Sequence, residues 1–444
     1  MLWMPILALC GVAGVLVAGE FGLLFGPGLA SILFFAAIAL GAPPAAAAWV
    51  IAASLCAAAF AVRRKFGPLP GGPAQGSWDW LLAGALALAA CFVILDAQTA
   101  YGANPHGEWD ASGIWNLRAR FLAGGPETWR RAVSNEPGSF LAEISHPAYP
   151  LFLSSFVAML WAGGGTWAAA APASVSGLLA AGVLGALVAG LRRRSTLLAA
   201  LAGLTLAATS YFSSQASAQY ADMALAYAFL AALALLDRGG GRASLFACGF
   251  AAGLAPWIKN EGQPFALAAL GVAAWRYGRG AAWILAGATP GLAATAAVKL
   301  LSDGREAMFP GTLGEAVSNA SDPARWMQVL GGFGGAVMDA GPWWAHPVVF
   351  AAAVILAAGF PPREELRRRL WLGAPLAAVF AAEFGVYLIT TSDLAWHLST
   401  SVTRLFLPLW PALVWLLFSA VRAPAEAPPS APAAGKRGKR RALS

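Results

Sequence analysis

The chain has 444 residues, of which 59% are hydrophobic and only 11% are charged. A soluble domain usually carries about 25% charged residues, so this composition excludes an ordinary soluble protein and indicates a multi-pass membrane protein. The formal net charge of +8 does not indicate nucleic-acid binding, because the basic residues form short clusters between apolar segments.

Long apolar segments recur along the chain. A helix needs about 20 apolar residues to cross about 30 Å of hydrocarbon. The sequence therefore predicts an all-α polytopic membrane protein with about thirteen transmembrane helices. A shorter apolar segment at 148–162 predicts an interfacial or re-entrant helix. The predicted spans lie near residues 2–18, 22–40, 45–62, 79–98, 167–190, 196–212, 218–236, 244–258, 262–277, 281–300, 345–360, 370–391 and 404–421.

Three regions are expected along the chain. Residues 1–66 hold N-terminal transmembrane helices, residues 67–422 hold the transmembrane core, and residues 423–444 form a disordered basic tail. No basic segment precedes the first apolar span, so we expect that span to be retained rather than cleaved as a signal peptide. The four Cys residues all lie in apolar segments, which is typical of small buried side chains and not of disulfides or a metal site.

The distribution of Lys and Arg predicts the orientation. Basic clusters such as "RRK" at 63–65, "RRR" at 192–194 and "REELRRR" at 363–369 alternate along the chain with loops that hold most of the carboxylates. The positive-inside rule then places the basic loops in the cytoplasm and the long loops near 99–147 and 301–344 outside. The predicted location is the inner (plasma) membrane.

Ionisable and aromatic residues gather in the predicted outer loops and at the outer ends of the spans. The densest stretch is "YGANPHGEWDASGIWNLRARF" at 101–121. Ionisable groups near hydrocarbon are costly and are often functional. These residues therefore predict one pocket at the outer membrane boundary, with carboxylates for base chemistry and cations for an anionic group. The candidates are Glu108, Trp109, Asp110, Trp115, Arg118, Arg120, His146, Asp222, Lys259, Glu261, His397 and Arg404.

Several candidates also have a structural interpretation. Asp222 could cap a helix, and Lys259 could form a local ion pair with Glu261. Arg404 could extend to the lipid headgroups, and the Trp residues could be plain interfacial aromatics. His146 is also consistent with a structural residue of the loop.

The order of the motifs resembles the GT-C glycosyltransferases, in the branch with protein O-mannosyltransferases and the lipid A aminoarabinose transferase (glycosyltransferase family 39-like). The pattern covers roughly residues 79 to 421. Many members of the family carry an Asp-Glu pair in the first outer loop, whereas here Asp110 is followed by Ala111 and Glu108 lies two residues earlier. The shared features are Asp110 in a long first outer loop, "HP.YP" at 146–150, "YAD" at 220–222, "K.EG" at 259–262 and the late Arg404.

The resemblance implies a GT-C-like core, with short interfacial helices on the outer loops and a periplasmic active site. The enzyme would transfer a sugar from a polyprenyl-phosphate-linked donor to a lipid, glycan or protein acceptor. Asp110 would be the general base, with Glu108 as the second carboxylate. Lys259 and Arg404 would hold the donor phosphate, with Arg118 or Arg120 next.

Further expectations concern cofactors, partners and competing functions. No residues have metal-ligand spacing, although a divalent cation held by Asp stays open. Membrane lipids are expected partners and nucleic acid is not. The competing functions are a membrane transporter, a lipid-linked glycan flippase, and a lipid-linked glycan polymerase or ligase. Transporters often contain internal repeats, and no repeat relates the two halves of this sequence.

Overall fold

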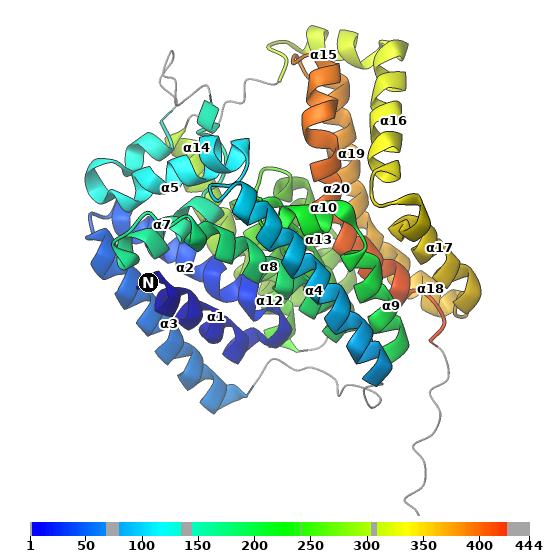
Figure 1. Cartoon of the computed structure of the whole chain (residues 1–444), viewed down its shortest axis with the longest axis horizontal. Coiled ribbons are helices and arrows are strands. Elements are labelled where there is room, and N and C mark those ends of the chain that lie inside the picture. The colour runs from blue at the N-terminus through cyan, green and yellow to red at the C-terminus, as the bar shows by residue number, and fades with distance from the viewer. Residues whose placement is uncertain (1, 68–79, 135–143, 240, 303–308, 424–444) are drawn as a thin grey trace, which may run out of the picture.

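A computed structural model describes residues 2–67, 80–134, 144–239, 241–302 and 309–423 (Figure 1). Within these ranges the elements are helices and none is a β-strand, which confirms the predicted all-α class. A helix satisfies its own backbone hydrogen bonds, which is what an apolar surrounding demands. Of the predicted basic tail at 423–444, residues 424–444 lie outside the described residues.

The fold consists of α-helices joined by short helical turns. The α-helices are, in chain order, α1 (Trp3–Ala18), α2 (Gly22–Ala39), α3 (Pro44–Phe66), α4 (Trp80–Ala103), α5 (Asn116–Ala123), α7 (Phe152–Gly164), α8 (Ala170–Arg192), α9 (Thr196–Ala207), α10 (Ser210–Gln215), α11 (Asp222–Arg238), α12 (Arg242–Ile258), α13 (Gly262–Tyr277), α14 (Ala281–Leu301), α15 (Leu313–Ala320), α16 (Pro323–Met338), α17 (Pro347–Ala358), α18 (Arg363–Leu370), α19 (Ala374–Ile389) and α20 (Leu394–Ser419). The short turns are η1 (Gly19–Phe21), the π-helical η2 (Ala111–Trp115), η3 (Gly125–Glu127), η4 (Trp129–Ala132), η5 (Gly278–Gly280), η6 (Trp343–Ala345) and η7 (Trp371–Gly373).

Seven helical segments of the described chain are long and apolar enough to cross a membrane, or up to eight if the bent α16 and α17 pair counts as one span. The predicted count of about thirteen is therefore not supported. The predicted spans at 196–212 and 244–258 form α9 and α12, which have 12 and 17 residues. Such helices are shorter than the roughly 20 residues that a span needs. The first two predicted spans lie in one helical segment of 37 residues.

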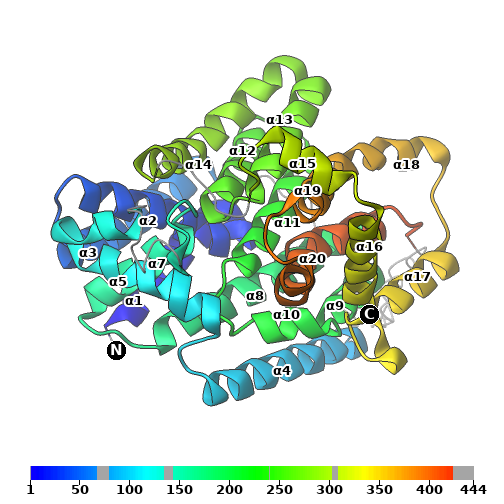
Figure 2. The same ribbon diagram turned by 90° about the horizontal axis from the view of Figure 1, so that it is seen from above.

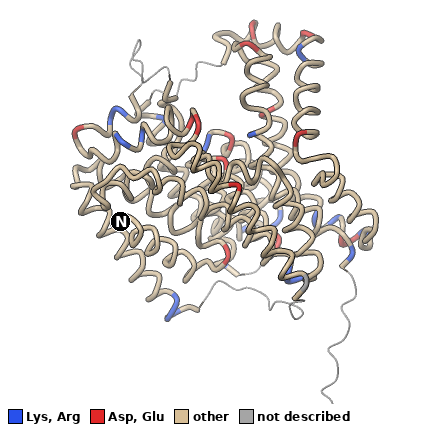
Figure 3. Tube along the Cα trace, viewed as in Figure 1, with Lys and Arg blue, Asp and Glu red and all other residues tan. Residues whose placement is uncertain are grey.

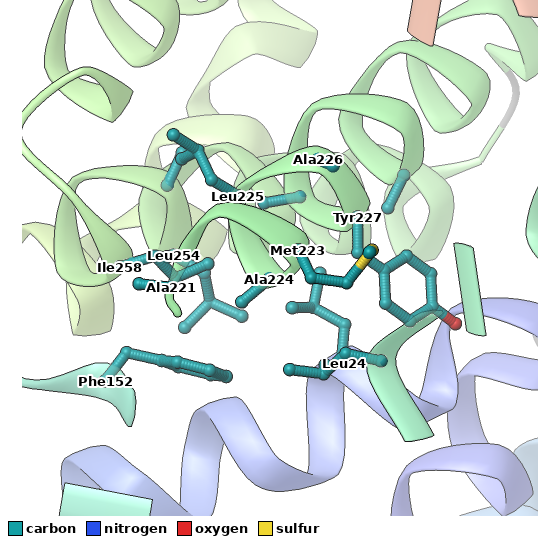
Figure 4. Close-up of a cluster of buried hydrophobic side chains, with 14 of the residues drawn as sticks. Leu24, Phe152, Ala221, Met223, Ala224, Leu225, Ala226, Tyr227, Leu254 and Ile258 are labelled. Carbon is teal, nitrogen blue, oxygen red and sulfur yellow. The ribbon is translucent and has the colours of Figure 1, made fainter. Parts of the chain in front are cut away.

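Helix α11 lies near the centre of the molecule when it is seen from above (Figure 2). Its residues from Asp222 to Leu236 are all buried, as expected for a helix that is apolar on every side. It packs against α8, α12 and α20. Figure 4 shows Met223 and Tyr227 of α11 in a cluster with Leu24 of α2, Phe152 of α7 and Leu254 of α12. Side chains of α1 to α3 belong to the same core, so the N-terminal region packs onto the rest of the chain.

Helix α7 occupies the segment predicted to be interfacial or re-entrant. It has 13 residues, and all but one of them are buried. It packs against α2, α3 and α5. A helix too short to span a membrane is tolerated at membrane depth when protein surrounds it. The sequence therefore predicted the short helix, and the structure places it in the protein interior.

Glycines allow α12 and α14 to pack with their backbones in contact. A Cβ atom added to Gly249 would lie 1.8 Å from the carbonyl oxygen of Ile284, and one added to Gly291 would lie 2.1 Å from that of Gly253. The two helices carry Gly249 and Gly253, and Gly287 and Gly291, each pair four residues apart. Small residues at this spacing are typical of close helix pairs in membranes.

The two ends of α11 differ in charge. Helices α11 and α12 have 17 residues each, or about 25 Å, and Asp222 and Lys259 lie at one end of this hairpin. At the other end, Glu20 pairs with Arg238 and with Arg193, the latter at 2.7 Å. Arg194 pairs there with Glu365 at 3.0 Å. Loops with the basic clusters thus meet at one end, and in Figure 3 the basic end of α3 lies along the same lower edge.

Substitution of a glycine tests the close contact between α12 and α14. Gly249→Ala places a Cβ atom 1.8 Å from a backbone oxygen, far closer than van der Waals contact allows, and overpacking of this kind costs about 1–3 kcal/mol. We expect a lower thermal unfolding midpoint for the purified full-length protein in detergent. Gly271→Ala in α13 is the matched control, because nothing lies within 4 Å of its added Cβ atom. An unchanged midpoint in Gly249→Ala would contradict the close packing.

Candidate functional site

The first element of the site is an ion pair between distant parts of the chain. The Asp110 carboxylate lies immediately before η2, and Arg404 lies in the middle of α20. The Oδ2 atom of Asp110 accepts a hydrogen bond from Arg404 at 2.6 Å, across 294 residues of sequence. Both side chains are about one quarter exposed, so a ligand can reach them from outside. Arg404 is therefore paired within the protein, which differs from the alternative expectation that it only extends to the lipid headgroups.

Tyr220 connects the ion pair to the loop that holds it. Its hydroxyl accepts a hydrogen bond from the backbone N–H of Asp110 at 3.4 Å and donates one to Glu108 at 3.3 Å. The guanidinium of Arg404 lies over its ring, 4.9 Å from the centroid. A cation over an aromatic face is stabilised by the ring quadrupole. Tyr220 therefore fixes both partners of the pair.

Lys259 forms the second element of the site. Its Nζ atom lies 3.0 Å from Asp222 and 2.8 Å from Glu261, and its side chain is only 7% exposed. Burial alone lowers the pKa of this ammonium group, but the two carboxylates outweigh burial and raise it. Lys259 is therefore charged and paired twice. The predicted local pair with Glu261 is present, and Asp222 is a second partner.

Asp222 is not a helix cap. The residue before it, Ala221, occupies the N-cap position of α11, and no side chain caps the helix there. The Asp222 carboxylate points instead to Lys259. Its charge also acts on Arg404, which links the Lys259 group to the Asp110–Arg404 pair. The two elements therefore form one cluster, which we call the ionic cluster (Asp110, Asp222, Lys259, Glu261 and Arg404).

Two strained residues border the ionic cluster. His146 and Gln219 have φ angles of +46° and +63°, and they are the non-glycine residues with positive φ in the described chain. Such conformations cost about 1–3 kcal/mol each and concentrate at functional sites. His146 stacks on Tyr149 at 4.8 Å between ring centroids. Burial lowers the pKa of His146, so its imidazole is neutral at pH 7.

Gln219 holds the Asp110 loop in place. Its side chain accepts a hydrogen bond from Asn116 at 2.8 Å and donates one to the carbonyl of Pro105 at 2.9 Å. Gly107 passes close to this contact, with a φ of +74°, and a Cβ atom there would lie 2.8 Å from the carbonyl oxygen of Ala218. The π-helical η2 then follows Asp110 directly. Single π turns are frequent at functional sites.

Arg118 has a structural environment. It is fully buried, and its guanidinium donates hydrogen bonds to four backbone carbonyls. The acceptors are Ala132, Pro147, Tyr149 and Pro150. These bonds fasten the 146–150 segment to α5. Arg120, two residues later, is exposed.

The remaining candidates lie around the cluster. Trp109 is 61% exposed, whereas Trp115 is buried against Tyr149 with ring centroids 5.9 Å apart. His397 lies seven residues before Arg404 on α20 and contacts the Tyr387 ring at 4.7 Å. Glu108 is exposed and belongs to the site through Tyr220.

Sequence reasoning missed Tyr220, Gln219 and Glu383. The Glu383 side chain is buried in α19, and its Oε1 atom has no hydrogen-bond partner among the described residues. Its charge interacts with those of Glu261, Lys259 and Asp222. A signal was present, because Glu383 is the one charged residue of α19. Tyr220 is part of the "YAD" motif but is not among the candidate residues, and Gln219 carries no comparable signal.

The ionic cluster has more carboxylates than cations, which raises the question of a metal ion. In the parts of the chain that the structure describes, no three His, Cys, Asp or Glu side chains are grouped so that they could hold one. The carboxylates are matched instead by Arg404 and Lys259.

No protein-family model, no curated protein and no solved structure matches the chain. The structure defines an all-α protein with helices of membrane-spanning length and an ionic cluster at the end of its central helix hairpin.

Arg118 and Arg120 form a matched pair for experiment. Arg118→Met removes all four hydrogen bonds and leaves buried carbonyls without a donor, so we expect a loss of about 3 kcal/mol or more. Arg120→Met changes an exposed side chain and should stay within about 0.5 kcal/mol of the wild type. Thermal unfolding of the two purified variants measures the difference. Equal stability of the two would show that Arg118 is not a structural residue.

Proposed function

We propose that the protein is an integral membrane glycosyltransferase. It transfers a sugar from a polyprenyl-phosphate-linked donor to a hydroxyl acceptor, with inversion at the sugar C1 atom. The observation that carries the proposal is the partly exposed Asp110–Arg404 pair, which puts a carboxylate and a guanidinium side by side at the end of the helices. The order of motifs that resembles GT-C enzymes is consistent with it.

The reaction needs two groups that this pair can supply. The acceptor oxygen attacks C1 of the sugar, the C1–O bond to the phosphate breaks, and the phosphate leaves with the bonding electrons. A carboxylate accepts the proton of the acceptor hydroxyl, and Asp110 has this role. A fixed cation stabilises the negative charge that develops on the leaving phosphate, and Arg404 has this role. Guanidinium binds phosphate oxygens in a bidentate manner.

In this proposal the donor phosphate replaces Asp110 as the partner of Arg404. A donor phosphate competes for the guanidinium, and Asp110 is then released to face the acceptor. Lys259 is nearly buried and already matched by two carboxylates, so its part is to hold Asp222, whose charge acts on Arg404. This differs from the sequence-based expectation, in which Lys259 contacts the phosphate directly.

A cavity beside α20 suits the acceptor. It has a volume of about 410 Å³ and lies between α16 and α20. Its polar lining includes Gln328, Asp339, Ser399 and Thr403, the last of which precedes Arg404 along the helix. Hydroxyl and amide groups of this kind bind sugar or protein hydroxyls by hydrogen bonds. What this cavity binds decides whether the acceptor is a lipid, a glycan or a protein. It also decides between a transferase and a polymerase or ligase.

A transporter is the second candidate function. The observation that favours it is Glu383, a carboxylate buried within α19 close to Lys259. Buried carboxylates inside membrane helices are typical of ion and substrate pathways. Reconstituted vesicles separate the candidates, because a transporter moves a labelled lipid-linked sugar across the bilayer whereas a transferase releases polyprenyl phosphate.

Asp110→Asn tests the enzymatic proposal. The change keeps the size of the side chain but removes the base, so release of polyprenyl phosphate from a panel of lipid-linked sugars should fall by about 100- to 10,000-fold. Glu127→Gln is the control, because it removes an exposed carboxylate from the same loop. The thermal midpoint of both variants is measured alongside. A folded Asp110→Asn protein with normal turnover would show that Asp110 is not the base.

The proposal also predicts which side of the membrane each loop faces, since the donor and the acceptor meet outside. Ser112, near Asp110, and Arg367, on α18, are both exposed and suit single-cysteine labelling. The background replaces the four native cysteines by Ala. With a membrane-impermeant maleimide on intact cells, we expect Ser112→Cys to react and Arg367→Cys to react only after the cytoplasmic side is opened. The reverse pattern would invert the topology and remove the periplasmic site.

A further inference from the structure

A large apolar cavity lies at the end of the molecule opposite the ionic cluster. Its volume is about 720 Å³, within the range of ligand pockets, and helices α1, α2, α3, α12 and α14 form its wall. Among the described residues, the lining is apolar apart from one charged side chain, Arg242, and includes no carboxylate.

Arg242 lies at the first position of α12, and Lys259 follows the last residue of that helix. A helix of 17 residues separates them by about 25 Å, so the cavity mouth and the ionic cluster lie at opposite ends. The cavity is therefore a separate place from the donor and acceptor site, and the inference does not rest on the proposed function.

The mouth of the cavity is positively charged. Arg242 has no ion-pair partner among the described residues, and its guanidinium lies over the ring of Trp283, 5.4 Å from the centroid. The last turn of α3 adds Arg63, Arg64 and Lys65, next to the lining residues Phe66 and Gly67. These basic side chains are exposed. The same end carries the other basic loops of the protein, so an anion is favoured there.

We infer that the cavity binds the hydrocarbon chain of a lipid whose anionic phosphate headgroup lies against Arg242. The apolar wall matches an acyl chain, and the cations at the mouth, which have no carboxylate partner in the described part of the chain, match a phosphate. Basic side chains at the cytoplasmic surface of a membrane attract anionic headgroups. The exposed apolar side chains of Phe66, Phe246 and Trp283 at the cavity give a lipid chain a route from the bilayer.

Lipid retention by the purified full-length protein tests the inference. The protein is mixed with equal amounts of phosphatidylglycerol and phosphatidylcholine that have identical acyl chains, and native mass spectrometry counts the lipid that stays bound. We expect the wild type to retain phosphatidylglycerol preferentially. Arg242→Gln should weaken this retention about fivefold, which corresponds to one basic residue at a headgroup. Arg279→Gln, an exposed Arg of the same end that does not line the cavity, should leave it unchanged.

A second pair of variants tests the chain-binding part. Ala59 is buried and lines the cavity, so Ala59→Phe should reduce retention of both lipids. Ala57→Phe adds the same ring to an exposed position of α3 outside the lining and should not. Thermal midpoints establish that each variant is folded. Equal retention of the two lipids by the wild type, an equal loss in Arg279→Gln, or no loss in Ala59→Phe would overturn the inference. Complete displacement of bound phosphatidylglycerol by an equal concentration of free glycerol phosphate would also overturn it, because the site would then bind the anion and not the hydrocarbon chain.

Discussion

A charge placed in apolar surroundings must be matched by an opposite charge close by, and the ionic cluster is built on this constraint. Lys259 is nearly buried, and without Asp222 and Glu261 it would lose its proton or destabilise the fold. The match fixes geometry, because Asp222 begins α11 and Lys259 follows α12. The ion pairs therefore lock the end of the central hairpin, and Arg404 is held beside that end by Asp110 and Tyr220.

The glycine contacts of α12 also fix the position of this helix. In an apolar surrounding, packing and not hydrophobic burial joins helices, so small residues that let backbones touch decide where a helix lies. Gly249 and Gly253 place α12 directly on α14. Gly262, just after Glu261, would bring a Cβ atom to 2.1 Å from the backbone of Ala255, so the turn that holds Lys259 is equally tight. Lys259 is thus positioned by backbone contacts as well as by charge.

The sequence predicts the all-α class, and it also singles out all five residues of the ionic cluster, because charges are rare in an apolar chain and each is conspicuous. It cannot predict how many segments cross a membrane, since composition does not show whether a helix of 12 or 17 residues, such as α9 or α12, spans. Nor could it separate Arg118 from Arg120, because only packing makes one buried and the other exposed. The positive φ of Gln219 has no sequence signal, since Gln is not a residue that favours it.

The two ends of the central hairpin use charge differently. At the basic end, Glu20 joins Arg193 and Arg238, but the cations around Arg242 have no carboxylate partner among the described residues. At the other end, carboxylates exceed cations, and each cation is occupied. An anion can bind the first end directly, whereas at the second it must displace a carboxylate from Arg404. In the proposed function that displacement is useful, because the base is freed only when the phosphate is bound. Donor binding and base activation are then one event.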